Sequence, residues 1–588
     1  MNGKRIVSLF GWFVLMAAFL YACCRYVFPF KEQLQMFQAT SQYATETLGR
    51  AGGLALYLSE FVAQFYVVLW TGPFVTALLL TIITFLTTRI LWQINRRDDL
   101  PLLACLPCLA LLFLHIDYDY YEQGTFAYLF LLLFLWLYVS LKSCKLRLFY
   151  GIFAIPVLYG IAGPVVHLFA LCAWLFELLT GGKNRYPAAM YVIVAGLCAL
   201  AGLHGGFSRN LSAAFFPDDY CNPLRLASGI YYAWWALPVV MLLSFALRKR
   251  WKAPVSWKGK TVWEGMQWLI VLLLAYQSLT HSEKWYDQES MKQDYSIRMG
   301  QWEQVIAEFN QEHLSKRRMC GLNLALAHQG QLSERLFDYP QQGIETLMLR
   351  WDQSVYTAQL HSDLYYCMGI ISASQKFAFE ALVSSHPSGN PRMLKRLVET
   401  NLIMGAYATA EKYIRLLENT WYYREWATAQ RRFLYQDKKV EQDKILGLKR
   451  RCWQAEVAAG KFYSNPVGSL MELLPVCPDN QAGLAYLTAF LLLNKDSKMY
   501  GELVETLYRT PAWREMTTCQ QEAVVIYRPN DLRFWLEHGV SIKVRNQAIR
   551  FMQEVQQLSR SGQNPARALA AEYGKTYWYY YMFNTAEK

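Results

Sequence analysis

The stretch Phe126–Leu141 (FAYLFLLLFLWLYVSL) decides the fold of the first half of this chain, because it is almost entirely apolar and carries no charge. A helix that crosses a bilayer needs about 20 mainly apolar residues, with a range near 17–25. Similar stretches recur on both sides of it, and the shorter ones have approximate ends. We therefore expect a bundle of about nine transmembrane helices, over Ile6–Cys23, Phe74–Trp92, Leu100–Leu114, Phe126–Leu141, Leu148–Gly163, Val165–Leu179, Tyr186–Leu203, Gly229–Leu247 and Val262–Leu279.

The density of charged residues changes near residue 280. Residues 1–280 hold 33 Lys, Arg, Asp and Glu, whereas the rest of the 588-residue chain holds 70. A chain of this length is also too long for one ordinary hydrophobic core. The sequence therefore predicts two domains, a membrane bundle over 1–280 and a soluble domain over 281–588.

The basic residues of the first domain favour one orientation of the predicted bundle. With the N-terminus in the cytoplasm, 16 of its 21 Lys and Arg lie on that side, in agreement with the positive-inside rule. The apolar stretch Leu54–Trp70 is not counted as a span, because Glu60 and Gln64 interrupt it and because counting it would invert every later loop. We expect a multi-pass protein of the inner (cytoplasmic) membrane, embedded in its lipid bilayer, with domain 281–588 extracytoplasmic (periplasmic). The net charge of +13 mainly reflects this topology, and we expect no nucleic-acid partner.

A long outer loop, residues 24–72, follows the first span. We take Ile6–Cys23 as a retained span rather than a cleaved signal peptide, because eight further spans follow it. The pattern of apolar residues in this loop predicts two helices. One is amphipathic, over Lys31–Leu48, and the other is apolar and partly embedded, over Leu54–Trp70.

The second domain has the periodicity of amphipathic helices joined by short turns, and strand patterns are nearly absent. The tripeptide Gly300–Trp302 (GQW) is echoed 105 residues later by Gly405–Tyr407 (GAY). We expect each glycine to end one helix in a left-handed conformation and each aromatic residue to open the next helix. This pattern resembles tetratricopeptide repeats, whose period is about 34 residues, and weaker copies occur near Gly330 and Gly460. We therefore predict an all-α chain whose second domain is a helical-repeat solenoid with a concave binding surface.

The segment His115–Glu122 (HIDYDYYE), between the third and fourth predicted spans, holds three carboxylates without a neighbouring Lys or Arg. Charged groups at the mouth of a membrane bundle are costly and therefore suggest a function. Asp117 and Asp119 could share Mg²⁺ or Mn²⁺, which prefer carboxylate oxygens, and such an ion could neutralise a phosphate leaving group. The alternative is an acidic, aromatic turn at the membrane surface, where tyrosines are common.

The topology, the long first loop and the Asp117-x-Asp119 triplet together resemble the GT-C class of membrane glycosyltransferases, including the catalytic subunits of oligosaccharyltransferases. The resemblance covers Met1–Thr280 as topology, plus that one triplet. It implies transfer of sugar from a polyprenyl-phosphate-linked donor to an acceptor on the outer face. The implied site comprises Asp117 and Asp119 as metal ligands and Glu32 or Glu46 as general base or metal ligand. We add Glu122 as a further candidate metal ligand and Arg209, Arg225 and Glu60 as candidate substrate-binding residues.

Three features depart from that class. No paired acidic motif directly follows the first span, no counterpart of the Trp-Trp-Asp acceptor motif is present, and a tetratricopeptide-like domain is unusual there. A second hypothesis is a non-enzymatic membrane scaffold whose repeats bind an envelope protein or a glycan. A transporter ranks behind both, because few charges lie mid-span and no inverted repeat is found. Motifs for nucleotide hydrolysis, flavin chemistry and zinc proteolysis are absent from the sequence.

The cysteines of the predicted outer side could form disulfide bonds, which an oxidising compartment permits. Their spacing along the chain defines no disulfide framework. They are Cys221, Cys320, Cys367, Cys452, Cys477 and Cys519.

Overall fold

The computed structural model describes residues 3–95, 101–222, 225–227, 229–250, 256–280, 287–310, 314–385, 389–459 and 465–584. Over these residues the protein is helical, and extended residues form only isolated bridges, which confirms the predicted all-α class. The chain divides into two compact units. The first comprises Met1–Lys292 with the short stretches Ser385–Pro391 and Glu418–Arg424, and the second comprises the remainder.

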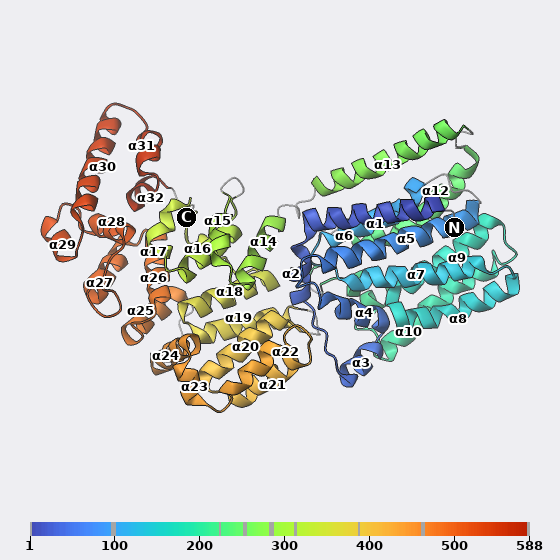
Figure 1. Ribbon diagram of the computed structural model, residues 1–588, viewed down its shortest axis with the longest axis horizontal. Coiled ribbons are helices and arrows are strands. Elements are labelled where there is room, and N and C mark those ends of the chain that lie inside the picture. The colour runs from blue at the N-terminus through green and yellow to red at the C-terminus, as the bar shows by residue number, and fades with distance from the viewer. Residues whose placement is uncertain are drawn as a thin grey trace. The chain divides into compact units, whose positions relative to one another are not determined.

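The first unit contains a helix at each of the nine predicted places, together with short helices in its loops (Figure 1). Three basic residues used to predict the orientation, Arg96, Arg97 and Lys252, lie outside the described residues. The helices are α1 (Gly3–Cys24), α2 (Val27–Gln33), α3 (Ser41–Leu48), α4 (Gly53–Ala63), α5 (Thr71–Asn95), α6 (Pro101–His115), α7 (Glu122–Ser140), α8 (Cys144–Ala162), η1 (Gly163–Val165), α9 (Val166–Thr180), η2 (Pro187–Ala189), α10 (Met190–His204), α11 (Leu211–Phe215), η3 (Pro217–Tyr220), α12 (Ile230–Arg250) and α13 (Trp257–Thr280).

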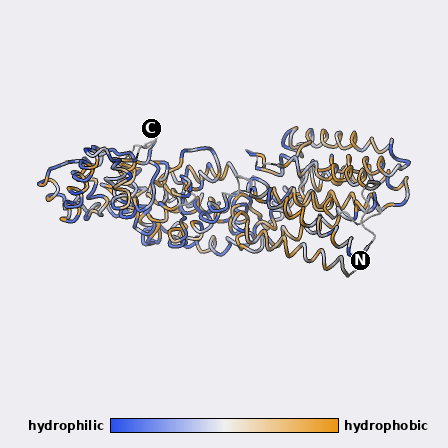
Figure 2. The backbone as a smooth tube through the Cα atoms, turned by 90° about the horizontal axis from the view of Figure 1, so that it is seen from above, coloured by the Kyte–Doolittle hydropathy of each residue, from blue (hydrophilic) through white to orange (hydrophobic). Residues whose placement is uncertain are grey.

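Several of these helices are long and apolar enough to cross a membrane. By length and composition, the described residues provide six such segments, one of which, Cys144–Thr180, contains both α8 and α9. The apolar parts of α6 and α13 are shorter. The hydropathy colouring of Figure 2 shows the same concentration of apolar residues in the first unit. The unit is therefore compatible with a membrane protein, whereas the count of nine spans stays a prediction.

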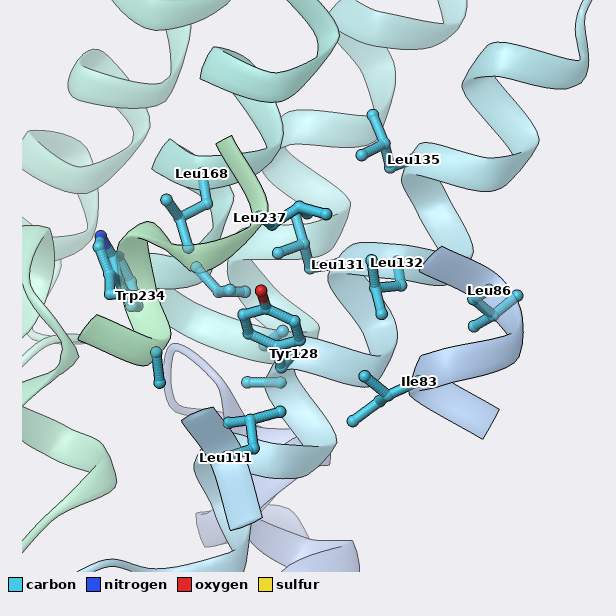
Figure 3. Packing of buried hydrophobic residues seen from close by; sticks show 14 of the residues in the cluster. Ile83, Leu86, Leu111, Tyr128, Leu131, Leu132, Leu135, Leu168, Trp234 and Leu237 are labelled. Atoms are coloured by element: carbon cyan, nitrogen blue, oxygen red, sulfur yellow. The ribbon is translucent and has the colours of Figure 1, made fainter. Parts of the chain in front are cut away.

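The bundle is packed around α5 and α7. Helix α5 contacts α1, α6, α7 and α12, while α7 also contacts α4, α8 and α9. Figure 3 shows Tyr128 of α7 among aliphatic side chains of its own helix and of the neighbouring helices. Close packing of this kind provides van der Waals contacts that fix the arrangement of helices. The aliphatic residues labelled there are Ile83, Leu86, Leu111, Leu131, Leu132, Leu135, Leu168 and Leu237.

Two glycines allow α8 and α10 to approach closely. A Cβ atom added to Gly151 of α8 would overlap the ring of Tyr191, and one added to Gly202 of α10 would overlap the ring of Tyr159. Small residues at helix contacts are common in membrane bundles, where packing replaces the hydrophobic effect as the driving force. By contrast, a Cβ on Gly160 of α8 would meet no described atom within 4 Å.

A buried polar network connects four helices of the bundle. Nε of Arg147 on α8 lies 2.8 Å from Oε1 of Glu177 on α9. The hydroxyl of Tyr138 on α7 donates to the same oxygen at 3.1 Å and lies 3.3 Å from the hydroxyl of Tyr191 on α10. A carboxylate in an apolar bundle requires such partners, so Glu177 has a structural explanation.

The loop after the first predicted span, residues 24–72, differs from the prediction. Helices α2 and α3, joined by a non-helical link, replace the single helix predicted over Lys31–Leu48. In that link Phe37 is buried and packs edge-on against Phe61 of α4. The side chain of Thr40 then caps α3 by accepting a hydrogen bond from the backbone N–H of Tyr43 at 3.2 Å. The apolar helix α4 is also shorter than predicted.

The rest of the chain is a succession of short and medium-length helices, and many consecutive pairs pack against each other, such as α18 with α19 and α26 with α27. They are α14 (Asp287–Arg298), α15 (Trp302–Ala307), α16 (Lys316–His328), α17 (Leu332–Arg335), η6 (Leu336–Asp338), η7 (Ile344–Thr346), α18 (Val355–Met368), α19 (Ile371–Val383), α20 (Pro391–Met404), α21 (Tyr407–Glu418), α22 (Arg424–Gln430), η8 (Arg431–Phe433), α23 (Asp437–Gln442), α24 (Lys444–Ala459), α25 (Pro466–Val476), α26 (Gln481–Leu493), α27 (Ser497–Leu507), α28 (Thr518–Tyr527), α29 (Leu532–Glu537), α30 (Ile542–Arg560), α31 (Pro565–Tyr573) and α32 (Tyr577–Phe583).

The predicted glycine turns are confirmed where the structure describes them. Gly300 follows α14 with φ of 68° and Gly405 follows α20 with φ of 75°, and α15 and α21 begin two residues later at Trp302 and Tyr407. Glycine adopts this left-handed conformation without steric cost. The copy near Gly460 lies outside the described residues, and the solenoid itself stays a prediction.

Candidate functional site

Five of the predicted site carboxylates are buried in the first unit. Their exposed fractions are 5% or less, so all five require compensation for the loss of water. Three belong to the segment between α6 and the start of α7, one lies in α2 and one lies in α4. They are Asp117, Asp119, Glu122, Glu32 and Glu60.

Asp119 is held in place by the loop between α10 and α12. Its Oδ1 accepts a hydrogen bond from Nδ2 of Asn222 at 3.1 Å, and the backbone N–H of Asn222 donates to the carbonyl of Asp119 at 2.8 Å. Asp117 fixes the turn from the other side, since its Oδ1 accepts from the N–H of Asp119 at 3.0 Å. The N–H of Tyr121 donates to the carbonyl of Tyr220 at 2.9 Å. The loop between α10 and α12 and the hydrogen bond within the segment itself therefore hold Asp117–Asp119 in a defined conformation.

Glu122 begins α7, and a helix N-terminus favours a negative charge. Its Oε1 accepts from the hydroxyl of Thr76 on α5 at 3.1 Å, and its Oε2 lies 3.4 Å from Nδ1 of His115 at the end of α6. Nε2 of His115 in turn lies 2.9 Å from the hydroxyl of Thr125. Glu122 thus links three helices at one end of the bundle.

Lys31 of α2 is the cation of this cluster, and sequence reasoning missed it. It is 1% exposed, and its Nζ lies 5.6 Å from the centre of the Tyr120 ring. Burial lowers the pKa of its amine to about 8, while the charges of Glu122 and Asp119 oppose that shift. Among the residues that the structure describes, none accepts a hydrogen bond from this Nζ. The available signal was the pair Lys31–Glu32, which follows the apolar run Val27–Phe30 just after the first span.

Tyr423 reaches Glu32 from far along the chain. It belongs to Glu418–Arg424, a short stretch that is part of the first unit. Its hydroxyl lies 2.9 Å from Oε1 and 3.2 Å from Oε2 of Glu32. The N–H of Ala39 donates to the carbonyl of Asn419 in the same stretch at 2.8 Å. Sequence offered no signal for this contact, because 391 positions separate Glu32 from Tyr423.

Glu60 lies in α4 close to the acidic triplet. Burial, and then the charges of Asp119 and Glu60, raise the pKa of the Tyr121 hydroxyl. The neighbouring Ser59 donates to the side-chain carbonyl of Gln35 at 3.4 Å, which joins α4 to the link after α2. The cluster therefore draws residues from both predicted outer loops.

The structure does not bring the other predicted residues into the buried cluster. Glu46 is exposed on α3, where it accepts a hydrogen bond from Gln42 at 2.9 Å. Arg209 and Arg225 are both exposed in the loop between α10 and α12. The N–H of Arg225 donates to the carbonyl of Asn222 at 3.1 Å, so its backbone lies beside the residue that holds Asp119.

The carboxylates do not form a ready-made metal site. No group of three or more His, Cys, Asp or Glu side chains is placed to hold a metal ion in the described part of the chain. The known hydrogen bonds of Asp117 and Asp119 are directed to the protein itself. The Mg²⁺ or Mn²⁺ site stays a prediction without support from this arrangement.

Comparison with known proteins gives one match. Residues 4–584 match the model of a family described as a family of unknown function (DUF6057). No curated protein and no solved structure matches the chain. The interpretation of the site therefore rests on its own geometry.

Proposed function

We propose that this chain, which belongs to the family of unknown function DUF6057, is a multi-pass membrane glycosyltransferase. It would transfer sugar from a polyprenyl-phosphate-linked donor to an acceptor on the outer face of the membrane. One observation carries the proposal. Lys31 of the first loop is buried beside Asp119 and Glu122 of the second, and Glu32, the next residue of α2, is buried as well.

The charges of this cluster suit the chemistry of sugar transfer. The acceptor hydroxyl would give its proton to Glu32, and its oxygen would bond to C1 of the sugar as the bond from C1 to the donor phosphate breaks. Lys31 would face the negative charge that grows on the leaving phosphate. Glu122 and Asp119 favour the charged form of Lys31 in a setting where burial opposes it, so these acids would act through the lysine.

The proposed orientation places the site on the outer face. The basic residues of the loops support a cytoplasmic N-terminus and nine spans, which would leave the second unit outside the inner membrane. Its succession of packed helices is compatible with a solenoid that binds an envelope protein or glycan. Arg209 and Arg225 are exposed in the loop between α10 and α12, which also carries Asn222, and they remain candidates to bind the donor phosphate.

A membrane scaffold without catalytic activity is the second candidate. It is favoured by the burial of all five acids and by the hydrogen bonds that Asp117, Asp119 and Glu122 make within the protein. In that case the cluster only fixes the loops on the bundle. The two functions differ in the role of Glu32. A glycosyltransferase needs its carboxylate as a base, whereas a scaffold needs it only for folding.

The test is to complement a strain that lacks the gene and to measure envelope glycans by mass spectrometry. The Glu32→Gln variant keeps the size and hydrogen-bonding capacity of the side chain but cannot act as a base, so we expect products to fall by about 100-fold or more. The matched control is Glu46→Gln, which changes the exposed glutamate of the same loop and should leave products unchanged.

Protein amounts in the membrane and gel-filtration profiles must be equal for both variants. Wild-type levels of every glycan in the Glu32→Gln strain would favour the scaffold.

A further inference from the structure

Two cysteines of the second unit lie side by side although nothing in their sequence spacing pairs them. Sγ of Cys452 on α24 is 2.9 Å from Sγ of Cys477, the residue that follows α25. The two helices pack against each other, and both thiols are buried, with exposed fractions of 0% and 2%. A disulfide bond is about 2.05 Å long, so the sulfurs need to approach by only about 0.9 Å to form one.

The surroundings hold both sulfurs in this position. A Cβ on Gly369, which has φ of 84°, would lie 3.1 Å from Sγ of Cys452, so the glycine leaves space for the sulfur. On the other side, Nδ2 of Asn480 donates to the carbonyl of Met368 at 2.7 Å, and its Oδ1 accepts from the N–H of Gly483. These contacts fix the turn that carries Cys477.

We propose that Cys452 and Cys477 form a structural disulfide bond that joins α24 to the end of α25. It would close a loop of 25 positions. The proposal rests on the outward orientation given above, because disulfides persist in oxidising compartments, but not on sugar transfer.

The reaction is a thiol–disulfide exchange with a protein disulfide oxidant. The thiolate of Cys477 attacks one sulfur of the oxidant disulfide and displaces the other as a thiolate. The thiolate of Cys452 then attacks the mixed disulfide, which forms the Cys452–Cys477 bond and releases the oxidant as a dithiol. The two protons of the cysteines go to solvent or to the oxidant, and the two electrons reduce it. The thiol contact with Cys452 lowers the pKa of Cys477, which favours it as the attacking group.

The test uses the full chain from native membranes, denatured with N-ethylmaleimide and without a reductant, then digested with trypsin. Each cysteine falls in a separate peptide, 452–461 and 462–495, and neither peptide holds a second cysteine. We expect mass spectrometry to find the two peptides linked in most molecules and separated after dithiothreitol. Recovery of both peptides as maleimide adducts without reduction overturns the proposal.

Two serine variants show whether a link between the peptides comes from Cys452 and Cys477. In Cys452→Ser, Cys477 should be recovered as a maleimide adduct, whereas Cys519→Ser should leave the link intact. If the link is missing in cells, the purified chain is treated with oxidised glutathione. If oxidised glutathione then links the two peptides, the sulfurs are placed as the structure shows but the second unit does not face an oxidising compartment. If it does not link them, the placement of the two sulfurs is wrong.

Glycan products of the Cys452→Ser/Cys477→Ser strain test sugar transfer separately, and we expect them unchanged in kind. Reduction should lower the unfolding midpoint of the linked protein by about 5–10 °C, because a closed loop restricts the unfolded chain. If the reductant lowers the unfolding midpoint of the Cys452→Ser/Cys477→Ser variant by the same amount, the Cys452–Cys477 bond does not stabilise the fold.

Discussion

Among single residues, Lys31 shows best how the fold creates a site that its sequence does not display. Around His115–Glu122 the sequence offers acids alone, and it therefore suggested a metal ion as their counter-charge. The fold supplies a lysine from the first loop instead. The acidity of this segment is visible in the sequence, but its burial and its lysine neighbour are not, because both depend on how two loops pack.

Removal of this cation should destabilise the protein. Lys31→Met would leave Glu122 and Asp119 buried without the positive charge near them, and we expect this loss of charge compensation to cost on the order of 1–3 kcal/mol. We expect a lower unfolding midpoint and less monodisperse protein in detergent. The double variant Lys31→Met/Glu122→Gln removes one negative charge as well and should recover much of the loss. If Lys31→Met is as stable as the wild type, the two charges are not coupled.

Glu522 of α28 predicts a pH dependence in the second unit. It is 5% exposed, its Oε2 accepts from the N–H of Tyr577 at 2.7 Å, and burial raises its pKa from 4.5 to about 8. The folded protein therefore holds a proton that the unfolded chain loses. This contribution to stability is complete below about pH 4.5 and is lost as the pH rises through 8.

We expect the free energy of unfolding to fall between pH 5 and 8 by at most about 1.4 kcal/mol per pH unit from this group. Glu522→Gln should remove that component, while the exposed control Glu515→Gln should keep it. Thermal unfolding of the three proteins from pH 5 to 9 measures the difference. Parallel curves for Glu522→Gln and the wild type would show that the carboxyl does not titrate in this range.

For whole elements, sequence was most informative where one physical requirement dominates. The need for long apolar helices indicated helices at nine places, and the left-handed glycines 300 and 405 marked two helix boundaries. Sequence was least informative in the loop of residues 24–72. The pattern over Lys31–Leu48 fits one amphipathic helix, but burial of Phe37 against α4 requires the chain to leave the helix there. Such a tertiary contact has no local signature.

Helix packing in the bundle gives a prediction with a control in the same helix. In Gly151→Ala the new methyl group meets the ring of Tyr191, and overpacking of this kind costs about 1–3 kcal/mol. In Gly160→Ala the methyl group has free space, and alanine favours helix by up to about 1 kcal/mol. In unfolding by a denaturing detergent, the free energy of unfolding of Gly151→Ala should therefore be lower than that of the wild type. That of Gly160→Ala should be equal to or higher than that of the wild type. The reverse order would contradict the packing of α8 on α10.

On the scale of the molecule, composition revealed a membrane-like half and a soluble-like half, and the structure has two compact units. Sequence could not show that Glu418–Arg424 belongs to the first unit, because no local pattern indicates which distant residues a segment contacts in the fold. The candidate site was predicted only partly, because it too depends on contacts between residues far apart in the sequence. The acids were found, whereas Lys31 and Tyr423 were not.

The proposed orientation predicts where the second unit can be reached. Trypsin added to spheroplasts should digest residues 281–588 and leave the bundle in the membrane, because the second unit would face outward. Lysed spheroplasts provide the reference for full access. A chain that is cut only after lysis would have the opposite orientation.

The central claim is that the buried cluster transfers sugar from a lipid-linked donor. Its most direct test is the amount of polyprenyl-phosphate-linked sugar in cells, measured by mass spectrometry of extracted lipids. With Glu32→Gln protein at normal levels, the donor cannot be consumed and should accumulate several-fold, as in a strain without the gene, while Glu46→Gln should match the wild type. An unchanged pool of every such lipid in both the Glu32→Gln strain and the strain without the gene would contradict the account.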